Sequence, residues 1–142
     1  MKDSLKAGLA HQFKFKIPPT KTVPHLYPES ESFRQMPEVL ATGYLVGLLE
    51  WACIEALRPH LDWPREQSVG TRIDVSHLAA TPPGMTVTVD VRLVRVEGRK
   101  LSFTVSAHDG GKPAACRIEA LTTRWTGLHS GSSWYAAGWL LK

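Results

Sequence analysis

The sequence predicts an α+β domain in which a curved antiparallel sheet wraps around one central helix. Residues 41–57 contain no proline and are rich in Leu and Ala, so this segment is long enough for a helix and too long for a typical strand. Segments that alternate apolar and polar residues, as half-buried strands do, lie on both sides of it. A single apolar helix needs a curved sheet to cover its faces, which favours this arrangement.

The first strand and the loop after it occupy residues 12–37. Residues 12–17, QFKFKI, alternate with the period of a strand, which Pro18 and Pro19 end. Residues 21–37 are polar and interrupted by prolines, so we expect a long loop with a helical turn near residues 31–34. Loops of this length inside a domain are usually functional, often as lids.

The central helix is expected to be deeply buried, because its apolar character extends almost all round. Residues 62–68 then read as a polar connection. Three or four antiparallel strands follow, near residues 72–77, 87–96, 101–107 and 114–125. The alternation slips at Val94 and Val96, which predicts a bulge. The last of these strands has a poor pattern.

Length and composition bound the class of protein. With 142 residues, 43% of them hydrophobic and 21% charged, the chain has ordinary globular values, and we expect one domain over residues 1–142. About residues 126–142 would form a divergent tail. The net charge of +4 is spread along the chain, which argues against a nucleic-acid partner and is compatible with a polyanionic small ligand.

The apolar and cysteine-containing segments indicate a cytoplasmic location. The longest apolar run is interrupted by Glu50, so we expect no membrane span, and no apolar block follows the first residues as in a signal peptide. Cys53 and Cys116 stand in unrelated contexts, which favours two buried thiols in a reducing compartment.

Glu50 is the most informative residue of the helix. Its helical neighbours at three, four and seven positions are all apolar or small (Gly43, Val46, Gly47, Cys53, Ile54 and Leu57). Glu50 should therefore project from a buried face, where a lone carboxylate is costly and points to a functional site. The structural alternative is a Glu that pairs with a buried Arg or caps a backbone group.

His77 and Thr42 are the other candidates. His77 keeps the strand phase of Ile73 and Val75, so it points to the same face, although a histidine on an apolar face is more often a satisfied core residue. Thr42 stands where the loop meets the helix and is expected to be the N-cap; the functional alternative places its hydroxyl beside a developing oxyanion. No further His or Cys has metal-ligand spacing, so we expect no metal site.

The spacing of Thr42 and Glu50 limits what they can do together. Eight residues of regular helix rise about 12 Å, so the two side chains cannot both touch one atom. Either Thr42 lies outside the helix, or the two residues act at different points of a substrate. Gly43 and Gly47 leave one stripe of the helix bare, which permits close approach of another backbone or a ligand.

Three blocks of the sequence resemble one family. KTVPHLYPES (residues 21–30), MPEVLATGYLVGLLEWAC (residues 36–53) and SHLAATPPGMTVTV (residues 76–89) are similar to the fluoroacetyl-CoA thioesterases and their relatives, which have the hotdog fold. The resemblance runs from about residue 21 to residue 110. It implies hydrolysis of a short acyl-CoA at a dimer-interface site, without a metal or redox cofactor.

The resemblance also implies roles for individual residues. The family's catalytic threonine, glutamate and histidine fall on Thr42, Glu50 and His77. Gly70 matches a glycine that contacts the acyl thioester, and Phe33 matches one of two phenylalanines that cover the acyl group.

Two departures from the family pattern concern substrate contacts. Met36 stands where the second of those phenylalanines is expected, which bears on selection of a fluorinated acetyl group. In the last strand the sequence ACRIE (residues 115–119) replaces a Gly-Thr-His-Glu-Arg-like run, so Glu119 stands near the position of a substrate-contacting arginine.

Taken together, the sequence predicts a homodimeric acyl-CoA thioesterase. Glu50 would act as general base or as nucleophile, Thr42 would polarise or position a reacting group, and His77 would protonate the leaving thiolate or orient the other two. Arg99, Lys100 and Lys112 are candidate contacts for coenzyme A phosphates, although a solvated charged turn explains them equally well. The alternatives are a non-catalytic acyl-CoA binder and a hydratase or dehydratase of the same fold, although the Asp–His pair typical of the latter is not found.

Overall fold

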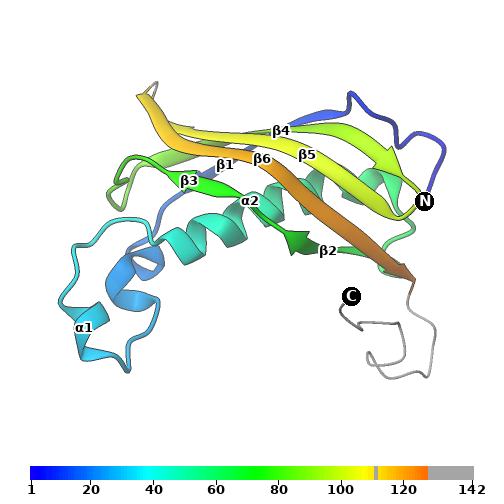
Figure 1. Cartoon of the computed structure of the whole chain (residues 1–142). Helices are drawn as coiled ribbons and strands as arrows, with labels where there is room; N and C mark the ends of the chain where they lie inside the picture. Colours follow the sequence, from blue (N-terminus) through cyan, green and yellow to red (C-terminus); the bar gives the residue numbers. More distant parts are fainter. Residues whose placement is uncertain (111, 128–142) are drawn as a thin grey trace.

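The computed structural model describes residues 1–110 together with the backbone of residues 112–127. One six-stranded antiparallel sheet curves over a central helix, α2 (Figure 1). The strands are β1 Ala10–Lys16, β2 Glu66–Arg72, β3 Val75–His77, β4 Thr86–Glu97, β5 Lys100–Asp109 and β6 Lys112–Gly127. The helices are α1 Glu31–Arg34 and α2 Thr42–Leu57, and single 3₁₀ turns occupy Pro19–Lys21, Val23–His25 and Arg58–His60.

The order of strands in the sheet is β1-β4-β5-β6-β2, and β3 also pairs with β6. Strand β1, which precedes the long loop, pairs with β4 and forms one edge, whereas β2 and β3 lie one after the other along β6 and form the opposite edge. This is the hotdog arrangement that the sequence predicts, with the helix lying against the concave side of the sheet.

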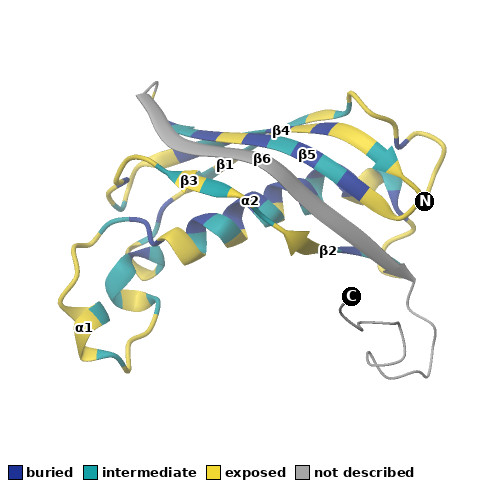
Figure 2. Cartoon of the chain, in the orientation of Figure 1, coloured by how far each residue is buried: buried dark blue, intermediate teal, exposed yellow. Residues whose placement is uncertain are grey.

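The core lies between α2 and the two middle strands, β4 and β5 (Figure 2). Inward-facing residues alternate along both strands and are fully buried, as the period of two requires. The largest of these side chains are Leu93, Leu101 and Phe103, and α2 contributes Leu49 and Leu57. This packing fixes the helix on the sheet and so positions the residues at its ends and edges.

The prediction that α2 is buried all round is wrong. One side of the helix is buried on the sheet, with Leu45, Leu48, Leu49, Ala52, Cys53, Ala56 and Leu57. The other side is open: Gly43 and Gly47 are exposed, and 43% of the Trp51 surface is accessible. A single sheet can cover only one side of a helix, so an apolar stripe remains uncovered in the isolated chain.

Several local predictions are confirmed, and one is corrected. The helical turn in the loop is α1, and the pairing of β4 with β5 shifts between Leu93 and Arg95, where a bulge was expected. Residues 66–68, expected in a polar connection, instead begin β2, because Glu66, Gln67 and Ser68 pair with β6. Pairing partners can impose a strand on polar residues.

The last predicted strand and the first two residues of the predicted tail form one strand, β6. The strand near residues 114–125 is confirmed as β6, which is longer than expected at both ends. Of the predicted tail, residues 126 and 127 belong to β6, and the remainder lies outside the described residues.

Within the described part of the chain the longest helix, α2, has 16 residues, and no helix meets the length and hydropathy of a membrane span.

Candidate active site

Thr42 and His77 are joined by a hydrogen bond. The Thr42 hydroxyl lies 2.9 Å from Nδ1 of His77, although the residues are 35 positions apart in the sequence. Thr42 is the first residue of α2, and the N-cap is Ala41, whose backbone is extended and whose side chain can accept no hydrogen bond. The expected N-cap role of Thr42 is therefore wrong, because its hydroxyl is directed to the imidazole.

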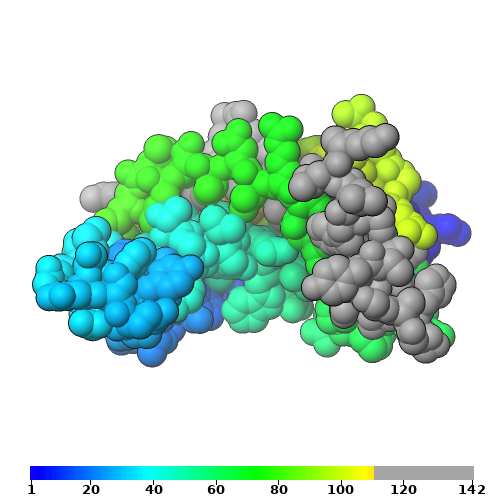
Figure 3. All heavy atoms as spheres, turned by 60° about the horizontal axis from the view of Figure 1, so that its bottom comes forward, coloured from blue at the N-terminus to red at the C-terminus, as the bar shows by residue number. Residues whose placement is uncertain are grey.

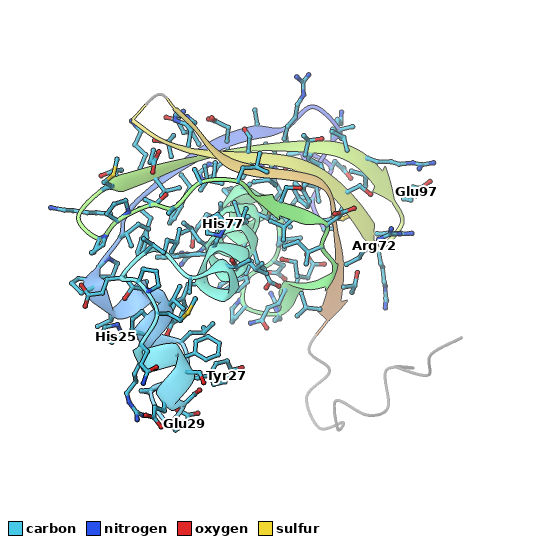
Figure 4. The ribbon with its side chains drawn as sticks, turned by 60° about the vertical axis from the view of Figure 1, so that its left-hand side comes forward. His25, Tyr27, Glu29, Arg72, His77 and Glu97 are labelled. Carbon is cyan, nitrogen blue, oxygen red and sulfur yellow. The ribbon has the colours of Figure 1, made fainter. Side chains whose placement is uncertain are left out.

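His77 reaches the helix from the edge of the sheet. It is the last residue of the three-residue strand β3 and is paired with Cys116 of β6. Its half-buried position matches those of Ile73 and Val75, so the phase expected from the sequence is confirmed. Figure 4 shows His77 beside the helix, on the side where α2 begins. The Thr42–His77 contact thus forms within one chain.

Glu50 is held by the backbone of β2. The Gly70 N–H donates a hydrogen bond of 2.6 Å to Oε1 of Glu50. A Cβ at position 70 would lie 2.8 Å from the same oxygen, closer than real Cβ atoms approach. Glycine is needed here because the carboxylate packs directly against the strand. The resemblance assigns Gly70 to the thioester; here its amide binds the carboxylate.

The expectation that Glu50 lies on a fully buried face needs correction. The side chain is half-buried, because Gly43 and Gly47 on the same side of the helix are open to solvent. One helical turn later, Cys53 is fully buried. Burial, and then the nearby charge of Glu50, raise the pKa of the Cys53 thiol to about 12, so this thiol stays protonated and is no candidate nucleophile.

Thr42 and Glu50 occupy the same side of α2 at different heights. The helix is continuous from Thr42 to Leu57, so Thr42 does not lie outside it. Eight residues at 1.5 Å each separate the two positions by about 12 Å along the axis. The sequence left two possibilities open: Thr42 outside the helix, or two residues that act at different points of a substrate. Within a single chain only the second remains.

The first turn of α2 adds a partial positive charge beside Thr42. The amides that begin a helix have no partner within it, and here no side chain caps them. Such amides, with the helix dipole, stabilise a negatively charged oxygen. A hydroxyl, an imidazole and free amides therefore meet at one end of the helix, which is an arrangement suited to acyl transfer.

The residues expected to cover the acyl group lie in the segment before α2. Phe33 of α1 packs edge-on against Tyr27, with ring centroids 5.3 Å apart, and 51% of the Met36 surface is accessible. The segment is attached to α2 by Leu26, which lies over Gly43, and by the Tyr44 hydroxyl, which donates to the His25 carbonyl. In Figures 1 and 4, α1 projects beyond the N-terminal end of α2.

The three basic residues expected at coenzyme A phosphates do not gather at one place. Arg99 and Lys100 follow the end of β4, whereas Lys112 begins β6 at the far end of β5. The ten residues of β5 span about 30 Å, so one phosphate group cannot contact both ends of the strand. Glu119 lies in β6, and its side chain is outside the described residues.

The described residues contain no group of three or more His, Cys, Asp or Glu side chains arranged to hold a metal ion. Sequence reasoning offered a backbone partner for Glu50 only as an alternative and did not identify Gly70, and it missed the attachment of Leu26 to Gly43. Two features hinted at them: a glycine inside a strand, and a glycine opposite the loop on the helix. Neither feature identifies the residue that the glycine contacts.

Comparison with known proteins places this geometry in a family. The family model of fluoroacetyl-CoA-specific thioesterase matches residues 23–116. The fluoroacetyl-CoA thioesterase of Streptantibioticus cattleyicolor is 58% identical over 110 residues, which is 78% of each chain.

Solved structures agree with this match. A crystal structure of a single-residue variant of the fluoroacetyl-CoA-specific thioesterase is 50% identical, with a TM-score of 0.83 over 89% of this chain and 92% of that one. Another variant, solved with acetyl-CoA, is 49% identical, with a TM-score of 0.82 over 87% and 91% of the two chains. A thioesterase-superfamily protein of Thermus thermophilus shares the fold at 24% identity and a TM-score of 0.74, over 88% and 86%. The chain belongs to the family of fluoroacetyl-CoA-specific thioesterases.

Proposed function

We propose that this protein hydrolyses the thioester of a short acyl-CoA, releasing a carboxylate and coenzyme A. The observation that carries the proposal is the Thr42–His77 hydrogen bond at the uncapped start of α2. The relatives that match over most of the chain carry the name of this activity, and one of their structures holds fluoroacetate and CoA. Water is the only other reactant that hydrolysis of a thioester requires.

Glu50 would activate the nucleophile. Its carboxylate is held at a fixed place by the Gly70 amide, and Oε2 is not used in that hydrogen bond. A fixed carboxylate can take a proton from water as a general base or attack the thioester carbon itself. Both routes remain open in this proposal.

Thr42 and His77 would act at the thioester oxygen and the leaving group. The free amides at the start of α2 and the Thr42 hydroxyl would stabilise the oxyanion that forms at the carbonyl. His77, which is held by Thr42 through Nδ1, can present Nε2 as the acid that protonates the departing thiolate. Each residue thereby has a role at a different bond.

The substrate would carry a small acyl group covered by Phe33 and Met36. The named relatives act on fluoroacetyl-CoA, and one structure binds acetyl-CoA. Met36 is flexible and half-exposed, so we propose that this protein selects less strictly among two- and three-carbon acyl groups than a lid of two phenylalanines would.

A homodimer would complete the site. The side of α2 that carries Thr42, Val46 and Glu50 is not fully covered by the sheet, and β2 and β3 form an edge paired only with β6 in the described residues. Thr42 and Glu50 lie four positions on either side of Val46. A two-fold axis near Val46, with the two helices antiparallel, would bring Glu50 of one subunit opposite Thr42 of the other. The cytoplasmic location stays a prediction.

The test is free-thiol release from acetyl-, fluoroacetyl- and propionyl-CoA by the wild type and by Glu50→Gln. We expect turnover by the wild type and a loss of at least about 100-fold in kcat for Glu50→Gln. Glu55→Gln is the matched control, because Glu55 lies on the same helix and bonds to Trp51 away from the site. Release of no thiol by folded wild-type protein would leave a binding protein instead of a hydrolase.

A further inference from the structure

A cavity lies on the side of α2 opposite Thr42. Its volume is about 250 Å³, and its lining includes Phe15, Lys21, Tyr44, Gly47, Leu48 and Trp51. Trp51 follows Thr42 by nine residues, and at 100° per residue these two side chains point in opposite directions from the helix. The cavity thus lies between α2, β1 and the segment before α2. In Figure 3, α2 lies at the surface beside that segment.

The walls of the cavity are mostly apolar. The Trp51 ring packs against Phe13 and Phe15, with centroids 4.7 and 5.7 Å away, and its N–H donates to Glu55. A Cβ at Gly47 would meet no atom within 4 Å. The missing side chain at this position therefore keeps the space open.

Lys21 places a positive charge beside this apolar cavity. The Lys21 ammonium lies 4.4 Å from the centre of the Tyr44 ring, and Lys21 is half-buried. Among residues 1–110 no acidic side chain forms an ion pair with it. Tyr44 cannot neutralise the charge, since its hydroxyl donates to the His25 carbonyl. A partly desolvated cation without an acidic partner favours an anionic ligand.

We propose that this cavity binds a short monocarboxylate, with its carboxylate on Lys21 and its hydrocarbon chain against Phe15 and Trp51. The cavity is smaller than the roughly 300–1,000 Å³ of drug-sized sites, so the ligand is about the size of hexanoate. One negative charge matches one lysine. The inference does not depend on the proposed hydrolase activity, because none of the lining residues named above belongs to the Thr42, Glu50 and His77 set.

The experiment follows the indole N–H resonance of Trp51 in ¹⁵N-labelled protein, assigned with Trp51→Phe. Hexanoate should shift this resonance saturably, and the neutral analogue 1-hexanol should bind at least about tenfold more weakly, since it lacks the charge-assisted bond. Lys21→Met retains the hydrocarbon stem and should weaken hexanoate binding by about tenfold. Gly47→Leu should abolish it by filling the cavity.

The variant Thr42→Ala distinguishes hexanoate binding in this cavity from binding in the candidate active site, where a carboxylate product could also bind. Hexanoate binding followed at Trp51 should be unchanged in this variant. The proposal is overturned if Trp51 does not respond to hexanoate, if 1-hexanol binds as tightly, if Lys21→Met has no effect, or if Thr42→Ala removes the response. Circular dichroism checks folding, and if Gly47→Leu does not fold, Lys21→Met decides the matter.

Discussion

At the scale of single residues, the tightest constraint in the candidate site is the contact between Glu50 and Gly70. The 2.6 Å hydrogen bond leaves no room for a side chain on the strand. The position of the carboxylate therefore depends on a residue that contributes only its backbone. A change at Gly70 acts on catalysis through Glu50, which makes Gly70 a positioning residue.

Gly70→Ala should lower kcat by at least about tenfold, because its Cβ would displace a carboxylate oxygen 2.8 Å away. KM should change less, and thiol release from acetyl-CoA measures both. The double variant Gly70→Ala/Glu50→Gln is the control. It should be no slower than Glu50→Gln alone, because two residues that act as a unit are not additive. Full kcat in Gly70→Ala would contradict the positioning role.

Residue types and spacing were enough to single out Thr42, Glu50 and His77, but not to show which residues they contact. The Thr42–His77 bond joins positions 35 residues apart, and the Glu50–Gly70 bond joins positions 20 apart. Both depend on how the strands register with the helix. Thr42 was expected to cap its own helix, a local interaction, and a partner distant in the sequence replaced it.

At the scale of elements, the segment before α2 is attached at its base and projects at its tip. Leu26 and His25 hold the base on Gly43 and Tyr44, whereas Met36 beyond α1 is half-exposed. The tip can therefore change position without breaking the attachment. Selectivity for the acyl group is expected to depend on the residues at this tip.

Met36→Phe should increase discrimination between fluoroacetyl-CoA and acetyl-CoA by about tenfold, measured as the ratio of kcat/KM values. A rigid ring adds contact area that the flexible thioether does not hold in place. Met85→Phe, at a similarly exposed methionine before β4, should leave the ratio unchanged. Equal ratios for all three proteins would show that position 36 does not select the acyl group.

A buried hydrogen bond ties the loop before β4 to the end of β5. The Thr81 hydroxyl donates to Oδ2 of Asp109 over 2.7 Å, and both residues are buried. Thr81→Val should lower the free energy of unfolding by about 1–3 kcal/mol, because the carboxylate would lose a partner where water cannot replace it. Urea denaturation measures this change. Thr88→Val, on the outer face of β4, should have an effect near zero, and equal effects would contradict the account.

Element boundaries show why local patterns were incomplete. The alternation in β4 and β5 predicted both strands and the bulge near Val94, since the inward residues of segments 87–93 and 101–107 are all apolar. Residues 66–68 carry no such pattern, because β2 is an edge strand whose place is set by pairing with β6. Polar strands of this kind become visible only through their partners.

At the scale of the whole molecule, the apolar character of α2 predicted more burial than one chain provides. The sheet covers the side of α2 that carries Leu45, Leu48 and Leu49. Gly43, Gly47 and Trp51 stay open. The pattern recorded how apolar the helix is but not which surface covers it. A second subunit is the proposed cover of the Val46 side, away from Trp51, and its arrangement could not be derived from periodicity.

Mixing two inactive variants tests whether subunits share the site. In a hybrid of Thr42→Ala and Glu50→Gln, one shared site carries both changes and the other carries none. Random exchange of subunits should then restore about a quarter of wild-type thiol release. A site within one chain would always carry one change, so mixing would restore nothing. Each variant mixed with itself is the control for the exchange procedure.

The brevity of β3 has a consequence for how the protein fails under stress. This three-residue strand pairs only with β6 among the described residues, and the Thr42–His77 bond is its other named attachment. Short edge segments open at a lower free energy than the core around Phe103. Activity should therefore disappear at a lower urea concentration than circular dichroism signal, and coincident curves would show that β3 opens only with the whole domain. Inactivation would then report the fraying of one edge while the rest of the protein remains folded.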